Sequence, residues 1–282
     1  MIKIIFFGDI SGEPGRVVIK KALPEILSLE KPDLVLANVD NLAHGKGVTV
    51  KTLEEMIRAG IQGFTSGNHA FSKKEFAAEV FEKYKNIIVR AANIPDTNPG
   101  STAIVLPTPK GEVLIGHFFG QVFMEKQFHD PITSPFAKVE EWMKEYQPKK
   151  YAATIIDLHA EVTSEKVAFG HFLDGKVSAV LGTHTHIPTA DAKVLPGGTA
   201  YITDVGMCGA ADSVLGVKKE LSLERFTTGN WVPFDIPEDA SEGELSYVMI
   251  NVDDTTGKAL DISSKHQIIK LSAKGGSASG GK

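Results

Sequence analysis

Residues that can bind metal ions follow five short apolar runs along this chain. They are Asp9, Asp40, Asn41, Asn68, His159, His184 and His186. Each stands at or just after the end of a run that is typical of a β-strand. Carboxylate, amide and imidazole ligands together suit a pair of borderline or hard divalent cations. The sequence therefore predicts a two-metal site, provided that the five strand ends meet in the fold.

Each motif taken alone has a simpler interpretation. Gly8-Asp9 and Asp40-Asn41 are common turn sequences, and a single histidine such as His159 is more often hydrogen-bonded than bound to metal. The segment 182–186 is the strongest single signal, because residues two apart in an extended chain point to the same side. The prediction of a metal site therefore depends on the five motifs occurring together.

The elements that must position these residues alternate along the chain. Strands are expected at 2–7, 33–37, 61–65, 152–158 and 177–181, and helices at 14–29, 49–59, 72–84 and 164–173, with Ser72 as a helix cap and Pro24 kinking or breaking the first helix. Alternating strands and helices imply parallel pairing through right-handed crossovers. Ligands of such sheets bind outside the carboxyl ends of the strands, which is where the five motifs fall.

Two hairpins interrupt this alternation. One is expected to join 102–106 to 113–118, and the other to join 247–252 to 259–271, with a short strand at 201–203 between them. The sequence shows no internal repeat and no linker between domains. We therefore expect one mixed α/β domain over residues 1–271, followed by a disordered Gly/Ser-rich tail at 272–282.

Composition narrows the class of protein. The chain has 282 residues and a net charge of −5, which argues against a broad nucleic-acid-binding face. A single cysteine excludes an intrachain disulfide and suits the cytoplasm. We find no secretory signal and no apolar stretch long enough to span a membrane. A cytoplasmic protein without a membrane partner is expected.

Other histidines and aromatic residues have less distinctive positions. His44, in a Gly-rich loop, and His117, at the end of a middle strand, are candidates to face the cleft, whereas His171 and His266 are taken as structural or exposed. A nucleobase would need an apolar shelf, for which the candidates are Phe71, Phe119, Phe123 and Phe128. Most aromatic residues in any protein belong to the core, so this expectation is the weaker one.

Several of these motifs resemble those of the calcineurin-like metallophosphoesterases, and in particular the YmdB-like bacterial phosphodiesterase branch. The resemblance rests on Gly8-Asp9, Gly67-Asn68-His69 and the segments 37–49, 157–186 and 199–216, and it covers about residues 1–270. It implies an α/β fold: a four-layer α/β/β/α sandwich of two mixed sheets flanked by helices.

The resemblance also implies a site and an activity. Asp9, Asp40, Asn41 and His186 would surround one metal ion, and Asp40 would bridge to a second ion held by Asn68, His159 and His184. The two divalent ions would be Fe, Mn or Zn, and would hydrolyse phosphodiesters, in particular 2′,3′-cyclic nucleotides, by a metal-activated hydroxide. His69 would be unligated and catalytic, beside the substrate. Glu161, Thr183 and Thr185 are expected to orient the histidines.

The chain departs from the branch at Phe71-Ser72, at His117 and, most importantly, next to Asn41, and this leaves alternatives open. The branch has Gly-Glu-Asn where this chain has Val39-Asp40-Asn41. A catalytically weak regulatory protein that retains the metal site is one alternative. A nuclease that processes RNA ends is another, and it would need a basic track beside the cleft. A dinucleotide-binding protein is disfavoured because the spacing in 8–12 does not match the required glycine motif. The sequence leaves a homo-oligomer open.

Overall fold

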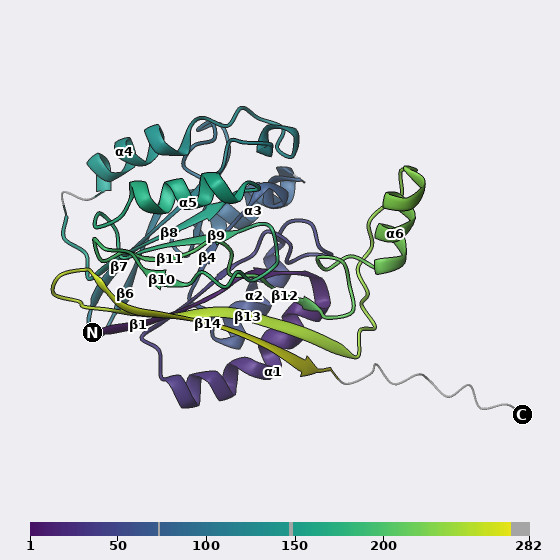
Figure 1. The fold of residues 1–282 in the computed structure, drawn as a ribbon, viewed down its shortest axis with the longest axis horizontal. Coiled ribbons are helices and arrows are strands. Elements are labelled where there is room, and N and C mark those ends of the chain that lie inside the picture. Colours follow the sequence, from purple (N-terminus) through teal and green to yellow (C-terminus); the bar gives the residue numbers. More distant parts are fainter. Residues whose placement is uncertain (73, 147–148, 272–282) are drawn as a thin grey trace, which may run out of the picture.

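The fold is that of an α/β protein with two mixed β-sheets packed face to face and helices on both outer faces (Figure 1). It is seen in a computed structural model that describes residues 1–72, 74–146 and 149–271. The predicted four-layer arrangement is confirmed. The expected disordered tail at 272–282 lies outside the described residues, and the single domain over 1–271 stays a prediction.

The first sheet contains the amino-terminal strand at its centre. Its strand order is β2-β12-β13-β1-β3-β4-β5, with β14 paired to β13. The bounds are β1 Ile2–Phe7, β2 Asp9–Ile10, β3 Leu34–Asn38, β4 Gly63–Thr65, β5 Ile88–Val89, β12 Met207–Ala210, β13 Glu242–Val252 and β14 Ala259–Lys270. Strands β1, β3 and β4 are parallel, so their carboxyl ends lie at one edge of the sheet.

The second sheet also contains a run of parallel strands. Its strand order is β10-β11-β9-β8-β7-β6, with bounds β6 Ala103–Thr108, β7 Gly111–Phe119, β8 Ala153–His159, β9 Ala179–Thr183, β10 Lys193–Val194 and β11 Ala200–Ile202. Strands β7, β8, β9 and β11 are parallel. The carboxyl ends of β8 and β9 therefore deliver His159 and the segment that contains His184 to the same edge.

Helices cover the outer face of each sheet. The α-helices are α1 Gly12–Glu30, α2 Val50–Ala59, α3 Lys74–Lys83, α4 Pro135–Tyr146, α5 Thr163–Phe172 and α6 Lys219–Thr228, and short 3₁₀ helices span Asn68–Phe71 and Met124–Lys126. One apolar cluster joins α1, α2 and α3 to the first sheet, and another joins α4 and α5 to the second. Helix α6 stands away from the rest of the molecule (Figure 1).

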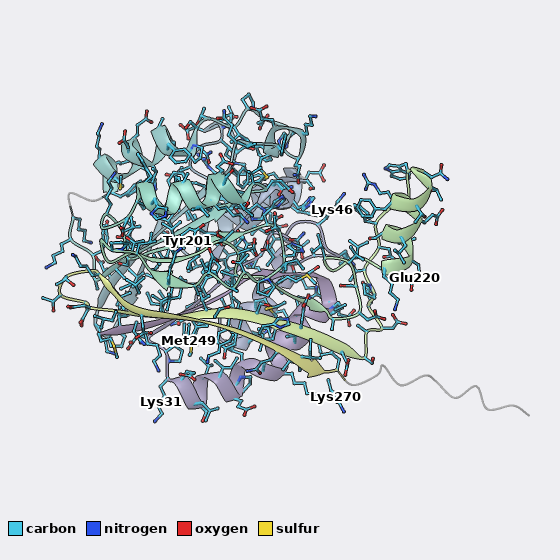
Figure 2. All side chains as sticks on the ribbon, viewed as in Figure 1. Lys31, Lys46, Tyr201, Glu220, Met249 and Lys270 are labelled. Carbon is cyan, nitrogen blue, oxygen red and sulfur yellow. The ribbon has the colours of Figure 1, made fainter. Side chains whose placement is uncertain are left out.

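The core explains why the first strand is apolar except at Lys3. Ile4 and Phe6 lie in the cluster between the two sheets, whereas Ile5 and Phe7 lie in the cluster beneath the helices. Alternate residues of a strand point to opposite faces, and here both faces are covered. Buried side chains fill the interior, and Tyr201, which is labelled in Figure 2, is one of them.

The structure corrects some of the predicted elements. Helix α1 continues through Pro24 and is not broken there. Pro24 and Lys20 both lie on the exposed side of the helix, so water can solvate the Lys20 carbonyl that loses its partner. Helix α3 begins at Lys74, and residue 73, between it and the predicted cap Ser72, lies outside the described part of the chain. Both hairpins are confirmed.

Several elements had not been predicted. They are α4, α6 and the short strands β2, β5, β10 and β12. Across the described ranges, no helix is long and apolar enough to cross a membrane.

Replacing Gly170 with alanine tests how closely α5 packs on the second sheet. A Cβ at this position would lie 2.4 Å from the ring of Tyr201, which is buried. We expect the free energy of unfolding to fall by about 1–3 kcal/mol through overpacking, although alanine favours helix. Denaturant unfolding measures this, and His171→Ala, at the exposed neighbouring position, is the control. An unchanged or raised midpoint for Gly170→Ala would contradict the packing.

Candidate metal centre

Asp9 reaches the carboxyl edge of the first sheet through a very close backbone contact. A Cβ on Gly8 would lie 1.8 Å from the Gly206 carbonyl oxygen, so only glycine fits there. Asp9 itself is fully buried, and its Oδ2 accepts a hydrogen bond from the His184 backbone at 3.1 Å. Burial, together with the charges of Asp204 and Asp40, raises the pKa of Asp9. The protein therefore compensates the ionised form of Asp9 only in part.

Asp40 follows β3 and faces Asp9 from the neighbouring strand end. Its Oδ1 accepts hydrogen bonds from the backbone nitrogens of His69 at 2.7 Å and Ala70 at 2.9 Å. Burial acts to raise the pKa of Asp40, but the close approach of His159 and the proximity of His69 and His184 outweigh it and lower the pKa below its usual range. Asp40 is therefore ionised at neutral pH.

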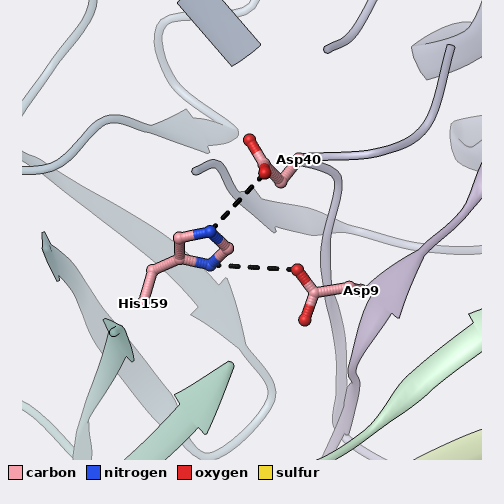
Figure 3. Close-up of side chains that lie close together, drawn as sticks. All are labelled: Asp9, Asp40 and His159. Carbon is pink, nitrogen blue, oxygen red and sulfur yellow. Dashed lines mark ion pairs between the residues drawn. The ribbon is translucent and has the colours of Figure 1, made fainter. Parts of the chain in front are cut away.

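His159 lies between the two carboxylates (Figure 3). Its Nδ1 is 3.8 Å from Asp9 Oδ1, and its Nε2 is 3.5 Å from Asp40 Oδ2. One ligand atom from each of the three residues lies within 4.8 Å of the others. Burial lowers the pKa of His159 to about 4, which keeps the ring in the neutral form that metal binding requires.

Two oxygens in this group have no protein partner. Among the described residues, Asp9 Oδ1 and Asp40 Oδ2 are buried side-chain oxygens without a hydrogen bond. A buried charged oxygen without a partner is costly, and two of them beside one neutral imidazole would be unstable unless a cation compensates them. The donor set therefore fits a bound divalent cation.

The other four predicted ligands surround this group. Asn68 Oδ1 lies 3.0 Å and His184 Nδ1 lies 3.1 Å from His159 Nε2. On the opposite side, His186 Nε2 lies 3.9 Å from Asp9 Oδ1 and 3.3 Å from Asn41 Oδ1. All seven predicted ligands thus form one continuous cluster at the shared edge of the two sheets.

Two of the histidines occupy an unfavourable backbone conformation. His184 has φ of 93° and His186 has φ of 64°, in the left-handed region that favours glycine. Such residues cost of order 1–3 kcal/mol each and persist where the surroundings fix them. Their outer ring nitrogens are paired, since His184 Nε2 lies 2.9 Å from Glu161 Oε2 and His186 Nδ1 lies 3.0 Å from the Leu215 carbonyl. The inner nitrogens therefore face the cluster.

Residues behind the cluster differ in part from the sequence-based expectations. Thr183 Oγ1 lies 2.9 Å from His159 Nδ1 and donates to Asp157 Oδ1 at 2.7 Å, so it is placed to orient His159, as expected. Thr185 instead donates to Asp204. His117 does not line the cleft: it is fully buried, with its Nδ1 3.4 Å from Asp157 Oδ2.

Asp157 is a residue that the sequence interpretation had missed. It is fully buried and also accepts hydrogen bonds from Thr65 and Asn38. Its position two residues before His159 in a strand could have revealed it, because both side chains then point to the same face.

A cavity opens beside the cluster. It has a volume of about 370 Å³, and its lining includes Lys46, Val48, His69, Ala70 and Phe76. The four phenylalanines that were expected as an aromatic shelf do not lie together on an exposed surface. Phe71, Phe119 and Phe128 are buried and pack against one another, and Phe123 is exposed. The structure thus places Phe76, which had not been predicted, in the lining of the cavity that also contains His69.

Comparison with known proteins identifies the family. A family model described as YmdB-like protein matches residues 5–264. The chain belongs to the YmdB-like family. It is 40% identical over 93% of its length, and 95% of the relative's, to a 2′,3′-cyclic-nucleotide 2′-phosphodiesterase of Bacillus subtilis.

Solved structures support the same fold for this YmdB-like chain. A novel phosphatase from Mycoplasma pneumoniae superposes with a TM-score of 0.86 at 35% identity, covering 95% of this chain and 94% of that one. A 5′-nucleotidase from Candida albicans superposes with a TM-score of 0.58 at 14% identity, covering 94% of this chain and 50% of the other. The second likeness shows the fold alone, which is metallophosphoesterase-like.

Asp9→Asn separates metal binding from folding. The amide cannot carry the charge that the protein leaves uncompensated, so we expect the metal-free variant to have a higher melting temperature than the metal-free wild type. Manganese affinity should fall at least about 100-fold, because a ligand matters at least as much as the groups that orient it. Calorimetric titration and metal-free thermal unfolding measure both. A lower metal-free melting temperature with unchanged affinity would contradict the assignment.

Proposed function

We propose that this chain is a dinuclear metal-dependent phosphodiesterase that hydrolyses nucleoside 2′,3′-cyclic phosphates. The observation that carries the proposal is the pair of buried, unpartnered carboxylate oxygens of Asp9 and Asp40, facing the neutral ring of His159. The printed name of the Bacillus subtilis relative supports this substrate class.

The seven clustered residues would hold the two ions. Asp9, Asp40, Asn41 and His186 would hold one, and Asp40, Asn68, His159 and His184 the other, with iron, manganese or zinc as the metals. When bound, the ions would supply an activated water and neutralise charge on the phosphate. Three histidines and two amides contribute no negative charge, so the site stays attractive to an anionic phosphodiester.

His69 would act on the departing oxygen. Hydrolysis joins a water oxygen to phosphorus and breaks one bond between phosphorus and a ribose oxygen, which then needs a proton. The backbone nitrogen of His69 is held by Asp40, and its half-buried ring lies in the lining of the cavity. Burial lowers the pKa of His69, and the Asp40 charge offsets this only in part. An anionic phosphate beside the ring would act in the opposite direction to burial and favour the protonated form that can donate.

The cavity beside His69 would receive the nucleoside. Its volume of about 370 Å³ is within the range of small-molecule sites, and its apolar walls include Val48, Ala70 and the exposed edge of Phe76. Lys46 lies in the same lining, on the side of the molecule that faces α6 (Figure 2). A cavity that fits one nucleoside favours a mononucleotide over the end of an RNA chain.

Other predictions accompany this proposal. They are a cytoplasmic location, no membrane partner and a single domain; a homo-oligomer is left open.

The proposal is tested by turnover of 2′,3′-cyclic nucleotides by the purified protein with added Mn²⁺. We expect hydrolysis that stops on chelation and returns when metal is restored, because the protein alone cannot activate the water. Asp9→Asn should lower kcat/KM at least about 1,000-fold, because the proposed ligands act as one unit and the loss of any one of them disables the others. Metal binding without turnover of any phosphodiester would favour the regulatory alternative instead.

Phe76→Ala tests the position of the base. Stacking of a base on an aromatic side chain contributes ~1–3 kcal/mol, so KM for 2′,3′-cyclic AMP should rise roughly tenfold. A cyclic phosphate of glycerol, which has no base, should be hydrolysed as well as by the wild type. Phe123→Ala, another exposed phenylalanine, is the matched variant. If Phe123→Ala raises KM and Phe76→Ala does not, the base lies elsewhere.

A further inference from the structure

One buried carboxylate outside the ligand cluster accepts an unusual number of hydrogen bonds. Asp204, which follows β11, is fully buried. Its Oδ2 accepts from Lys166 Nζ at 2.7 Å, from the Thr185 backbone at 3.1 Å and from Thr185 Oγ1 at 2.6 Å. Its Oδ1 accepts from the Gly206 backbone at 2.8 Å. Both oxygens are therefore used as acceptors.

These bonds connect Asp204 to both sides of the candidate metal centre. Thr185 stands between His184 and His186, the two ligands with positive φ. On the other side, the Gly206 carbonyl accepts the Asp9 backbone N–H at 3.1 Å. A single carboxylate thus fixes the backbone on which three of the seven proposed ligands are carried.

The charge of Asp204 is balanced by a lysine that is itself buried. Lys166 lies on α5 and is fully buried, and its Nζ also donates to Thr185 Oγ1 at 3.1 Å. A buried ion pair is not an efficient way to stabilise a fold, because an apolar pair of similar size often does as well. An apolar pair could not replace the hydrogen bonds that Lys166 and Asp204 make to Thr185.

We propose that Lys166 and Asp204 are positioning residues that hold the backbone at 184–186 and at Asp9 in the geometry needed to bind metal. This inference rests on the proposed function, since it concerns the same centre. Neither residue is a metal ligand. Together they impose the left-handed conformations at His184 and His186, which the local sequence would not adopt by itself.

The double variant Lys166→Met with Asp204→Asn separates positioning from stability. Each single variant leaves a buried charge without its partner and should lower the melting temperature of the metal-free protein strongly. The double variant removes both charges and should recover most of that loss. Asparagine offers one acceptor oxygen where aspartate offers two, so either Thr185 or Gly206 loses its partner. Manganese affinity should therefore stay about 10- to 100-fold below the wild type.

Two measurements give the outcome. Calorimetry measures Mn²⁺ affinity, and the visible spectrum of the Co²⁺-loaded protein reports the arrangement of the ligands. We expect the spectrum of the double variant to differ from that of the wild type. The control is Thr199→Val, which removes a fully buried hydroxyl at the other end of β11 that donates to the Val177 carbonyl at 2.6 Å. It should lower the melting temperature and leave affinity and spectrum unchanged.

The results distinguish two failures. A double variant with wild-type affinity and spectrum would overturn the positioning role, as would an equal loss of affinity in Thr199→Val. A wild type that binds no Mn²⁺ or Co²⁺ would instead overturn the metal centre on which the inference rests.

Discussion

Two buried carboxyl groups at the junction of the sheets, those of Asp9 and Asp40, are the constraint on which the rest of this structure depends. Asp9 and Asp40 each lie two residues after one of the adjacent parallel strands β1 and β3, and each keeps one oxygen that no group in the described residues satisfies. Folding must therefore place the two carboxyl groups close together, and burial beside Asp40 and Asp204 makes the charge of Asp9 unfavourable. Such an arrangement could hold a cation, and the surrounding imidazoles and amides offer it nitrogen and oxygen donors.

The sandwich architecture makes this convergence possible. Each sheet brings the carboxyl ends of its parallel strands to one edge, and the two sheets share the apolar layer that contains Ile4 and Ile155. Glycine residues allow the side chains of the centre to approach one another closely. A Cβ on Gly67 would lie 2.4 Å from Asp40 Cγ and 2.6 Å from His159 Nε2. Glycine at this position, as at Gly8, lets ligands from separate strands approach closely.

The sequence indicated which residues would gather at the candidate metal centre better than it indicated the residues that pack behind them. Asp9 and Asn68 could be found because polar residues directly after an apolar strand are local signals. Lys166 and Asp204 could not, because a lysine on a helix gives no sign of being buried until the helix is docked. The same limit explains the phenylalanines: Phe71 and Phe128 are near the site in sequence, but their rings complete the core. Of the two helices that were missed, α6, with its exposed Phe226, lacks an apolar face, whereas α4 has one that includes the buried Val139 and Trp142.

Asp40 stands where the resemblance implies a glutamate. Its two oxygens make contacts with different roles, one toward the candidate metal centre and one that supports the backbone around it. Asp40 uses one oxygen to accept two backbone N–H groups at the start of the 3₁₀ helix Asn68–Phe71, which brings Asn68 and His69 to the cluster. Its other oxygen remains directed at His159. Val39, where the branch has glycine, is fully buried in the apolar cluster beneath the helices. Its side chain therefore packs into the core instead of blocking the backbone, and the shorter carboxylate next to it is held by two amides rather than left to adjust freely.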